Sequence, residues 1–232
     1  MSKKTVLTIS DIHYPFAHRD HLDFLQEVNE KYSPDEVVCI GDECDFHAIS
    51  DWDHSPNGFS PQHEYKAALK DMHKLYALFP RVKSCISNHT ARPYRRAYKF
   101  GIPEEFLKSY RDLLEAPKGW AWANKWEIDG IIYEHGEKVG GKFAHRVAAT
   151  QNMQSTVIGH LHSNAGVSYV ANPKFLIFGM AVGCLLDNDT YAFAYGKHAR
   201  EKPILGVGVV DKGIPMFVPM LLQSGGRWVG KL

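Results

Sequence analysis

The sequence predicts an α/β fold. In the N-terminal half, short β-branched runs alternate with amphipathic helical patterns, which is typical of βαβ units and a parallel sheet. In the C-terminal half, β-rich stretches follow one another and are separated by Gly, Asn and Pro. The chain of 232 residues is 44% hydrophobic and 23% charged, a composition that suits a globular protein and excludes disordered and fibrous classes.

The N-terminal half contains three predicted strands, and each one ends at polar residues. An amphipathic pattern over 20–31 stops at Pro34, and a longer one over 62–79 stops at Pro80, because proline cannot continue a helix. The predicted elements in chain order are a strand at Thr5–Ile9, a helix at 20–31, a strand at 36–40, a helix at 62–79 and a strand at 82–86.

The remaining elements include a hairpin, because Asp129-Gly130 favours a tight turn between two strands. Helices are predicted at 103–115 and 143–152, and strands at 126–128, Ile131–Glu134, 156–158, 167–170, 175–178, 191–194, 204–210 and 216–219. No internal repeat, low-complexity segment or linker interrupts the pattern, so we expect a single domain over residues 1–232.

The cysteines and the apolar runs indicate a cytoplasmic protein with no membrane partner. No stretch approaches the roughly 18 consecutive apolar residues that a membrane span needs, and the N-terminal apolar run is too short for a signal peptide. The cysteines form no CxxC pair, which favours buried reduced thiols over disulfides. They are Cys39, Cys44, Cys85 and Cys184.

Charged residues are segregated along the chain. The formal net charge is +1, yet 13 acidic and only two basic residues lie between Asp11 and Glu64. The stretch from Arg81 to Lys99 holds six basic residues and no acidic one, and the chain has 13 histidines. Such segregation indicates that the fold holds both cations and an anion.

Five predicted strands end at residues of the types that bind metal ions. In an open parallel sheet, the carboxyl ends of the strands meet at one edge, where ligands bind. Carboxylates can bridge two ions and imidazoles can complete each coordination sphere; ligation without thiolate suits Mn, Fe, Zn or Ni. The strand-end motifs are Asp11-x-His13, Gly41-Asp42-x-x-Asp45, Asn88-His89, His135-Gly136 and Gly159-His160-x-His162.

This order of motifs resembles the calcineurin-like metallophosphoesterases, which include protein phosphatases, cyclic-nucleotide phosphodiesterases and SbcD-type nucleases. The motifs extend from Asp11 to His162, and the compact length and residues 45–50 are similar to small phage-encoded members. The resemblance implies two β-sheets packed as a sandwich and flanked by helices. It also implies a hydrolase of phosphomono- or phosphodiesters, in which a metal-bridging water or hydroxide attacks phosphorus.

The resemblance assigns a role to each motif. It implies that Asp42 bridges two divalent ions, with Mn²⁺ expected first and Fe, Zn, Ni or Mg as alternatives. It implies that His89 serves the leaving group and that Asp45 orients His89. The ligands implied for the first ion are Asp11, His13, Asp42 and His162, and those for the second are Asp42, Asn88, His135 and His160.

One block departs from the family pattern. The usual Gly-Asn-His followed by Asp or Glu reads Ser87-Asn88-His89-Thr90 here. The serine is a small change that a turn without positive φ tolerates. The threonine removes a carboxylate beside the predicted catalytic histidine, although no predicted metal ligand is lost.

The sequence leaves the substrate open. We expect a phosphoester, and nucleotides and nucleic acids are among the candidates. Arg92 and Arg95 follow the predicted catalytic histidine and either bind phosphate or lie on a solvated helix face. The basic stretch would also suit a DNA or RNA nuclease. The alternative from another functional class is a module that binds metal or ligand without catalysis.

Two further segments also have two interpretations each. Residues 46–61 form either a self-packed loop or a substrate lip. The tryptophans that either pack in the core or stack on bases are Trp120, Trp122 and Trp126.

Overall fold

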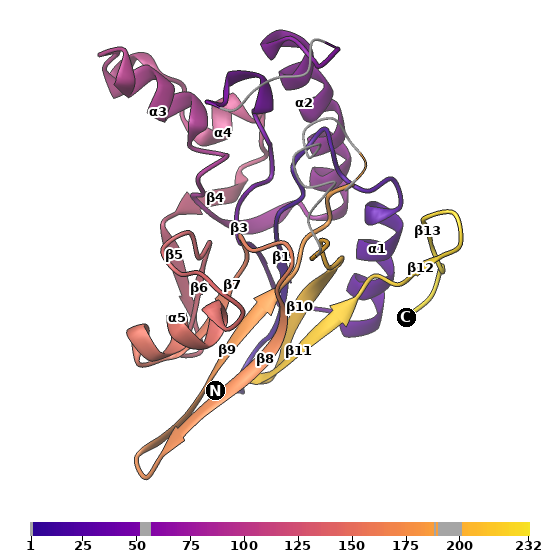
Figure 1. Ribbon diagram of the computed structural model, residues 1–232, viewed down its shortest axis with the longest axis vertical. Coiled ribbons are helices and arrows are strands. Elements are labelled where there is room, and N and C mark those ends of the chain that lie inside the picture. Colours follow the sequence, from indigo (N-terminus) through magenta and orange to yellow (C-terminus); the bar gives the residue numbers. More distant parts are fainter. Residues whose placement is uncertain (1, 52–56, 188, 190–200) are drawn as a thin grey trace.

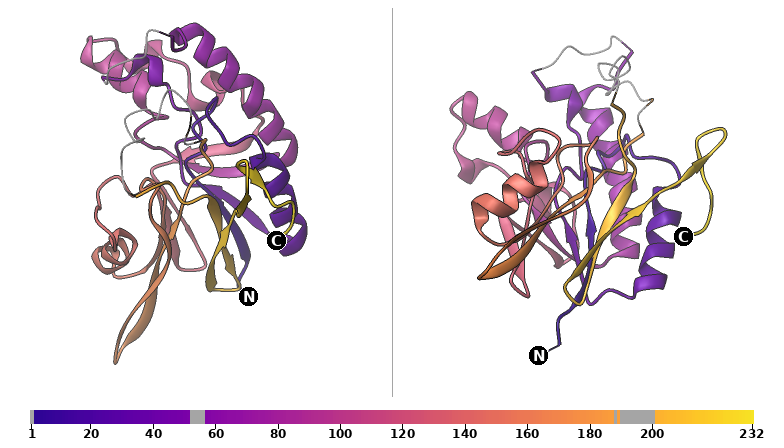
Figure 2. Two further views of the ribbon diagram at one scale, coloured as in Figure 1. Left: turned by 45° about the vertical axis from the view of Figure 1, so that its right-hand side comes forward. Right: turned by 60° about the horizontal axis from the view of Figure 1, so that its bottom comes forward.

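The computed structural model describes residues 2–51, 57–187, 189 and 201–232 (Figure 1). It contains two main β-sheets flanked by helices, which confirms the predicted fold class. Figure 2 shows that the purple helices of the N-terminal half and the orange helix of the C-terminal half lie on opposite outer sides of the two sheets. The predicted strand at 191–194 lies outside the described residues.

The first sheet contains the N-terminal strands and one later hairpin. Its members are β1 (Thr5–Ile9), β2 (Glu36–Cys39), β3 (Arg81–Cys85), β4 (Gly119–Ala123), β10 (Gly206–Asp211) and β11 (Ile214–Pro219). Their order is β11-β10-β1-β2-β3-β4. The strands β1 to β4 are parallel, as the alternation of strands and helices predicts, and β10 and β11 pair antiparallel beside them.

The second sheet is formed by the middle of the chain. Its members are β5 (Lys125–Ile128), β6 (Ile131–Glu134), β7 (Ser155–Ile158), β8 (Ala165–Asn172) and β9 (Phe175–Val182), in the order β5-β6-β7-β9-β8. The hairpin between β5 and β6 turns where it was predicted: Asp129 and Gly130 have φ of 52° and 74°, as a type I′ turn requires.

The helices and short strands complete the chain. The α-helices are α1 (His21–Tyr32), α2 (Pro61–Leu78), α3 (Arg92–Lys99), α4 (Tyr110–Leu113) and α5 (Ala144–Asn152). The single-turn helices are η1 (His47–Ile49) and η2 (Glu104–Phe106), and the short strands are β12 (Leu222–Gln223) and β13 (Arg227–Trp228). None of these helices is long and apolar enough to cross a membrane.

Two apolar layers hold the sheets in place, because successive side chains of a strand point to opposite faces. Val6 and Val38 belong to the core between the two sheets, where they meet Val157 and Met180. Leu7 and its neighbours on the other face pack against helices α1 and α2. The four cysteines are free and buried, as the sequence predicted.

One predicted helix is wrong. Residues 103–115 are not a single helix, because η2 and α4 are separate short elements with an extended stretch between them. Ser109 begins α4 as an N-cap: its side chain accepts a hydrogen bond from the Asp112 amide at 3.2 Å. Phe106, the last residue of η2, is 80% exposed.

Candidate metal centre

The predicted metal ligands lie after five strands and meet at one end of the two sheets. The loops after β1, β2 and β3 come from the first sheet, and those after β6 and β7 come from the second. Backbone hydrogen bonds join these loops: the His13 amide donates to the Asp42 carbonyl at 2.9 Å, and the Gly159 amide donates to the His135 carbonyl at 3.1 Å. The topology therefore brings together motifs that are far apart in the sequence.

The first group of ligand-type residues consists of Asp11, His13 and His162. His162 Nε2 lies 3.2 Å from Asp11 Oδ1, and His13 Nε2 lies 3.8 Å from the same oxygen. The two imidazole Nε2 atoms are 3.0 Å apart. One ligand atom from each residue lies within 4.8 Å of the others, which is a spacing that a single cation can span.

The second group consists of Asp42, His135, His160 and Asn88. His135 Nε2 lies 3.3 Å from Asp42 Oδ2, 3.1 Å from His160 Nδ1 and 2.7 Å from Asn88 Oδ1. Carboxylate, imidazole and amide oxygen are the donor types that divalent transition metals accept together.

Asp42 lies between the two groups. Its Oδ2 is 3.3 Å from His135 Nε2 in the second group and 3.7 Å from His13 Nε2 in the first. The carboxylate is 1% exposed, so it is directed into the centre and away from solvent. This placement fits a carboxylate that bridges two ions.

Four of these residues have left-handed backbone conformations. The φ angles of Asp11, His13, Asp42 and His160 lie between 51° and 66°. Non-glycine residues in this region carry a conformational cost and cluster at functional sites, where the surrounding structure holds them. The centre therefore concentrates backbone strain at the residues that the sequence identified as ligands.

Hydrogen bonds orient the ligand side chains from behind. His135 Nδ1 donates to the Ile40 carbonyl at 2.9 Å, which leaves Nε2 directed into the centre. Asp11 Oδ2 accepts the His160 amide at 2.9 Å and the Ser10 hydroxyl. Sequence reasoning missed Ser10, whose only signal was its position next to Asp11.

The electrostatics of the centre are those of closely packed acids and imidazoles. Burial opposes ionisation of Asp11, yet contacts from His13 and His162 hold its pKa well below the usual range. Burial would lower the pKa of His13, but Asp11 and Asp45 raise it to about 10. Burial likewise opposes charge on His135, while Asp42 raises its pKa to about 9. A cation that binds here therefore displaces protons from the imidazoles.

His89 lies beside Asp42 and contacts Asp45, as the predicted catalytic pair requires. The His89 amide donates to Asp42 Oδ1 at 3.1 Å, and its Nδ1 is 2.9 Å from Asp45 Oδ1. Asp45 is 1% exposed, and its other carboxylate oxygen lies 3.5 Å from His13 Nδ1. One carboxylate thus contacts both the predicted catalytic histidine and a predicted metal ligand.

The structure separates the two arginines that were predicted to bind substrate. Arg92 turns inward: its NH1 donates to the Asp45 carbonyl at 2.7 Å, and its NH2 lies 3.3 Å from His89 Nε2. Arg95 is exposed on α3. Arg92 is therefore the one of the pair that contacts His89.

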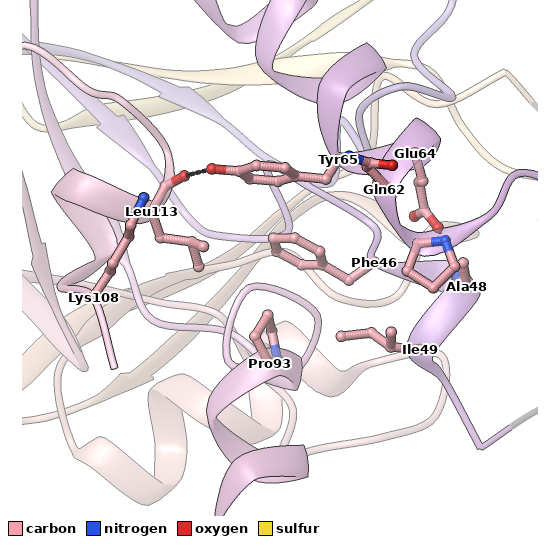
Figure 3. Close-up of a pocket in the computed structure, with 10 residues that line it drawn as sticks. Phe46, Ala48, Ile49, Gln62, Glu64, Tyr65, Pro93, Lys108 and Leu113 are labelled. Carbon is pink, nitrogen blue, oxygen red and sulfur yellow. Dashed lines mark hydrogen bonds between the residues drawn. The ribbon is translucent and has the colours of Figure 1, made fainter. Parts of the chain in front are cut away.

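The described part of the loop 46–61 packs against its surroundings. Glu64 of α2 accepts the amides of His47 and Ala48, each at 2.6 Å, and so holds η1 in place. An apolar pocket of about 350 Å³ lies beside η1. Figure 3 shows Phe46 pointing into it. Tyr65 closes one side by donating to the Leu113 carbonyl at 2.6 Å. These contacts attach the described part of the loop to α2.

The three tryptophans use their indole N–H groups inside the protein. Trp120 is fully buried and donates to the Phe79 carbonyl at 2.9 Å. Trp126 donates to the Ser84 carbonyl at 2.8 Å, and Trp122 donates to Glu43 at 3.0 Å. Packing explains these residues better than base stacking does.

Comparisons with known proteins place the chain in a family. The family model described as calcineurin-like phosphoesterase matches residues 4–177. No curated protein matches the chain.

Among solved structures, the chain is similar to a predicted phosphoesterase from Streptococcus pneumoniae, with 15% identity, 91% of this chain and 85% of that chain covered, and a TM-score of 0.36. A metallophosphoesterase from Sphaerobacter thermophilus is 14% identical, with 91% and 85% covered and a TM-score of 0.39. The nuclease MPE of Pseudomonas putida is 12% identical, with 80% and 76% covered and a TM-score of 0.39. Because the family model covers most of the chain, including every predicted ligand, this protein belongs to the calcineurin-like phosphoesterases.

Proposed function

We propose that the protein hydrolyses phosphomono- or phosphodiesters with the help of two divalent metal ions, and that Mn²⁺ is the first metal to test. The observation that carries this proposal is the pair of ligand groups with Asp42 between them, 3.7 Å from His13 Nε2 and 3.3 Å from His135 Nε2, and with His89 immediately beside it. Fe, Zn, Ni and Mg are the alternative ions, since the donors are oxygen and nitrogen.

The donor set fits two ions with one shared carboxylate. When bound, such ions neutralise phosphoryl oxygens and acidify the attacking water. The residues that would hold the first ion are Asp11, His13, Asp42 and His162, and those that would hold the second are Asp42, Asn88, His135 and His160.

His89 would give a proton to the oxygen that leaves phosphorus. Because Asp45 Oδ1 is 2.9 Å from Nδ1, the opposite ring nitrogen, Nε2, is the one that can face the substrate. Asp45 also stabilises the protonated ring and fixes its orientation. Arg92, whose NH2 lies 3.3 Å from Nε2, would bind a phosphoryl oxygen during the same step.

A substrate panel tests the proposal. The manganese-loaded protein is incubated with p-nitrophenyl phosphate, bis(p-nitrophenyl) phosphate, a cyclic nucleotide and linear DNA. Hydrolysis of the monoester indicates a phosphatase, and hydrolysis of the diesters indicates a phosphodiesterase. Metal binding without turnover of any substrate, with each candidate metal, would identify a non-catalytic binding module and refute the proposal.

A nuclease is the second candidate, and α3 favours it. This helix follows His89 directly and exposes Arg95 and Lys99. A nucleic-acid strand whose phosphate occupied the metal centre would meet these cations. Binding of linear DNA should then weaken steeply as salt rises, because phosphate contacts release counterions. Salt-independent hydrolysis confined to small esters would exclude the nuclease.

A further inference from the structure

Glu43 is a buried carboxylate that the proposed chemistry does not use. It lies between Asp42 and Asp45 in sequence and is fully buried. Its Oε1 accepts hydrogen bonds from the Ser84 hydroxyl and from Trp122 Nε1, the latter at 3.0 Å. Its Oε2 accepts the hydroxyl of Thr90. A buried carboxylate is costly unless it is hydrogen-bonded, so the fold has built a specific site for this one.

Thr90 connects Glu43 to the backbone of the metal centre. The Ser87 hydroxyl donates to Thr90 Oγ1 at 3.0 Å, and the Asp42 amide donates to Ser87 Oγ at 2.8 Å. The hydrogen bonds therefore run without a break from the Asp42 amide through Ser87 and Thr90 to Glu43. We call these four residues the Glu43 network.

The network encloses the two residues of the third motif. Asn88 and His89 lie between Ser87 and Thr90, so both ends of this short loop are attached to the network. Asn88 Oδ1 is 2.7 Å from His135 Nε2, and the His89 amide donates to Asp42 Oδ1 at 3.1 Å. Small movements of this loop would displace both a predicted metal ligand and the predicted proton donor.

The network uses both residues at which the chain departs from the family pattern. Ser87 stands in place of the usual glycine, and Thr90 stands in place of the usual acid. A Cβ added to Gly41 would lie 2.5 Å from Ser87 Cβ, so the serine requires glycine at position 41. The two departures are thus parts of one hydrogen-bonded arrangement.

We infer that Glu43 is a positioning residue, which acts through Thr90 and Ser87 to hold the loop of Asn88 and His89 against Asp42. Glu43 comes from the motif that contains Asp42. It supplies a carboxylate next to Thr90, the position at which the family pattern has an acid. The effect on rate rests on the proposed hydrolytic function, whereas the effect on the loop does not.

Thr90→Val tests the inference because it keeps the shape of the side chain and removes only the hydroxyl. We expect kcat to fall by about 10- to 100-fold, as is typical when a group that orients a metal site is lost, with KM little changed. Thr90→Ser should restore most of the rate, because it restores the hydroxyl.

Glu43→Gln and the double variant Glu43→Gln/Thr90→Val complete the test. Two changes to one hydrogen-bonded chain should not add, so the double variant should lose about as much rate as Thr90→Val alone. Thr156→Val is the matched control: Thr156 is also fully buried, and its hydroxyl donates to the Gln154 carbonyl at 3.0 Å, away from the network. It should lose stability without losing rate.

Amide hydrogen exchange on the metal-free protein gives a readout that needs no turnover. The His89 amide should exchange faster in Thr90→Val than in the wild type, and Thr156→Val should leave it unchanged. Unchanged exchange of this amide in Thr90→Val, or a kcat equal to that of the wild type, would overturn the inference. If the wild type hydrolyses no ester, the proposed function fails, and the exchange measurement still decides the role of Glu43.

Discussion

His89 is the residue on which the proposed chemistry depends most directly. Its Nδ1 contacts Asp45, and its ring lies 4.6 Å from that of His13. The sequence predicts a catalytic role for His89 and does not include it among the metal ligands. His89→Asn should therefore reduce kcat by about 10²- to 10⁴-fold, the usual contribution of a general acid, while manganese affinity changes little.

The measurement is steady-state hydrolysis of an ester with a poor leaving group, together with calorimetric titration of Mn²⁺. A poor leaving group matters because it needs the proton most. Full turnover of such an ester by His89→Asn would show that His89 does not protonate the leaving oxygen.

Gly159 is required by close packing at the first ligand group. A Cβ at this position would lie 1.9 Å from Ser10 Oγ and 2.5 Å from Asp11 Oδ2. Gly159→Ala should displace the Asp11 carboxylate and weaken Mn²⁺ binding by about tenfold or more. Gly140→Ala is the control, since nothing lies within 4 Å of its added Cβ. Equal manganese affinities for the two variants in a calorimetric titration would refute this role.

At the residue scale, the sequence predicted which side chains meet but not how they are held. The strand-end positions of Asp11, Asp42 and Asn88 were enough to predict their proximity, because the parallel strands of one sheet end at one edge. The hydrogen bond from Thr90 to Glu43 joins residues 47 positions apart, and no pattern in the neighbouring sequence predicts it. The assignment of individual metal ligands stays a prediction.

At the scale of elements, the end of the chain is attached to the start of α1. Asp20 is the N-cap residue of α1, yet its side chain does not cap the helix. It instead accepts hydrogen bonds from Arg227 Nε at 2.8 Å and from the Trp228 amide at 2.9 Å, both in β13. Because Asp20 is only 5% exposed, this pairing holds the short β12–β13 hairpin against the helix.

The Asp20 pairing should make stability depend on pH in acid. The hydrogen bond from Arg227 lowers the pKa of Asp20 to about 2, below the usual aspartate value of about 3.9. A lowered folded-state pKa stabilises the fold above the unfolded-state value, and this stabilisation is lost as the pH falls toward about 2. Asp20→Asn should therefore destabilise the protein by a constant amount above pH ~5, and by less as the pH falls.

Urea denaturation at several pH values measures this difference. Glu137→Gln, which changes an exposed carboxylate after β6, serves as the control and should show no such trend. A difference between the wild type and Asp20→Asn that stayed constant down to pH ~2 would contradict the role of the ion pair.

Elements with a strong pattern were predicted well, and those formed by tertiary contacts were not. The helix α2 has a long apolar stripe and ends before Pro80, so its bounds were predicted within one residue at each end. The strand β4 was missed, because its alternating tryptophans resemble no β-branched run and its pairing with β3 is not local. The helix predicted at 103–115 failed because Ser109 starts a new helix inside it.

At the scale of the whole molecule, the candidate metal centre contains residues from both sheets. Asp11, Asp42 and Asn88 follow strands of the first sheet, whereas His135 and His160 follow strands of the second. The fold class could be predicted because the motifs carried the family resemblance. The packing of the two sheets through Val38 and Met180 could not be predicted, because the sequence of an apolar strand does not indicate which element its side chains contact.

Metal binding should therefore stabilise the entire fold. Ions held by both sheets bind the folded chain and not the unfolded one, so free Mn²⁺ at 100 times its Kd should add about 2.7 kcal/mol of stability. The measurement is Tm by calorimetry as a function of Mn²⁺, with EDTA as the reference. A Tm that does not respond to Mn²⁺ or to the other candidate ions would contradict a metal centre between the sheets.

The most direct test compares the wild type with Asp42→Asn in the hydrolysis of p-nitrophenyl phosphate and its bis ester. Asp42 lies within reach of both ligand groups, so its replacement should abolish the hydrolysis that depends on Mn²⁺. This Mn²⁺-dependent hydrolysis is the part of the turnover that EDTA removes. Asp211→Asn is the control, because Asp211 accepts the Thr5 hydroxyl at 2.6 Å and lies far along the sheet from the centre. Metal-dependent hydrolysis by the wild type and by Asp211→Asn, with none by Asp42→Asn, is the predicted result. Equal turnover by Asp42→Asn and the wild type, or no turnover by the wild type with any candidate metal, would contradict a hydrolytic centre built on Asp42.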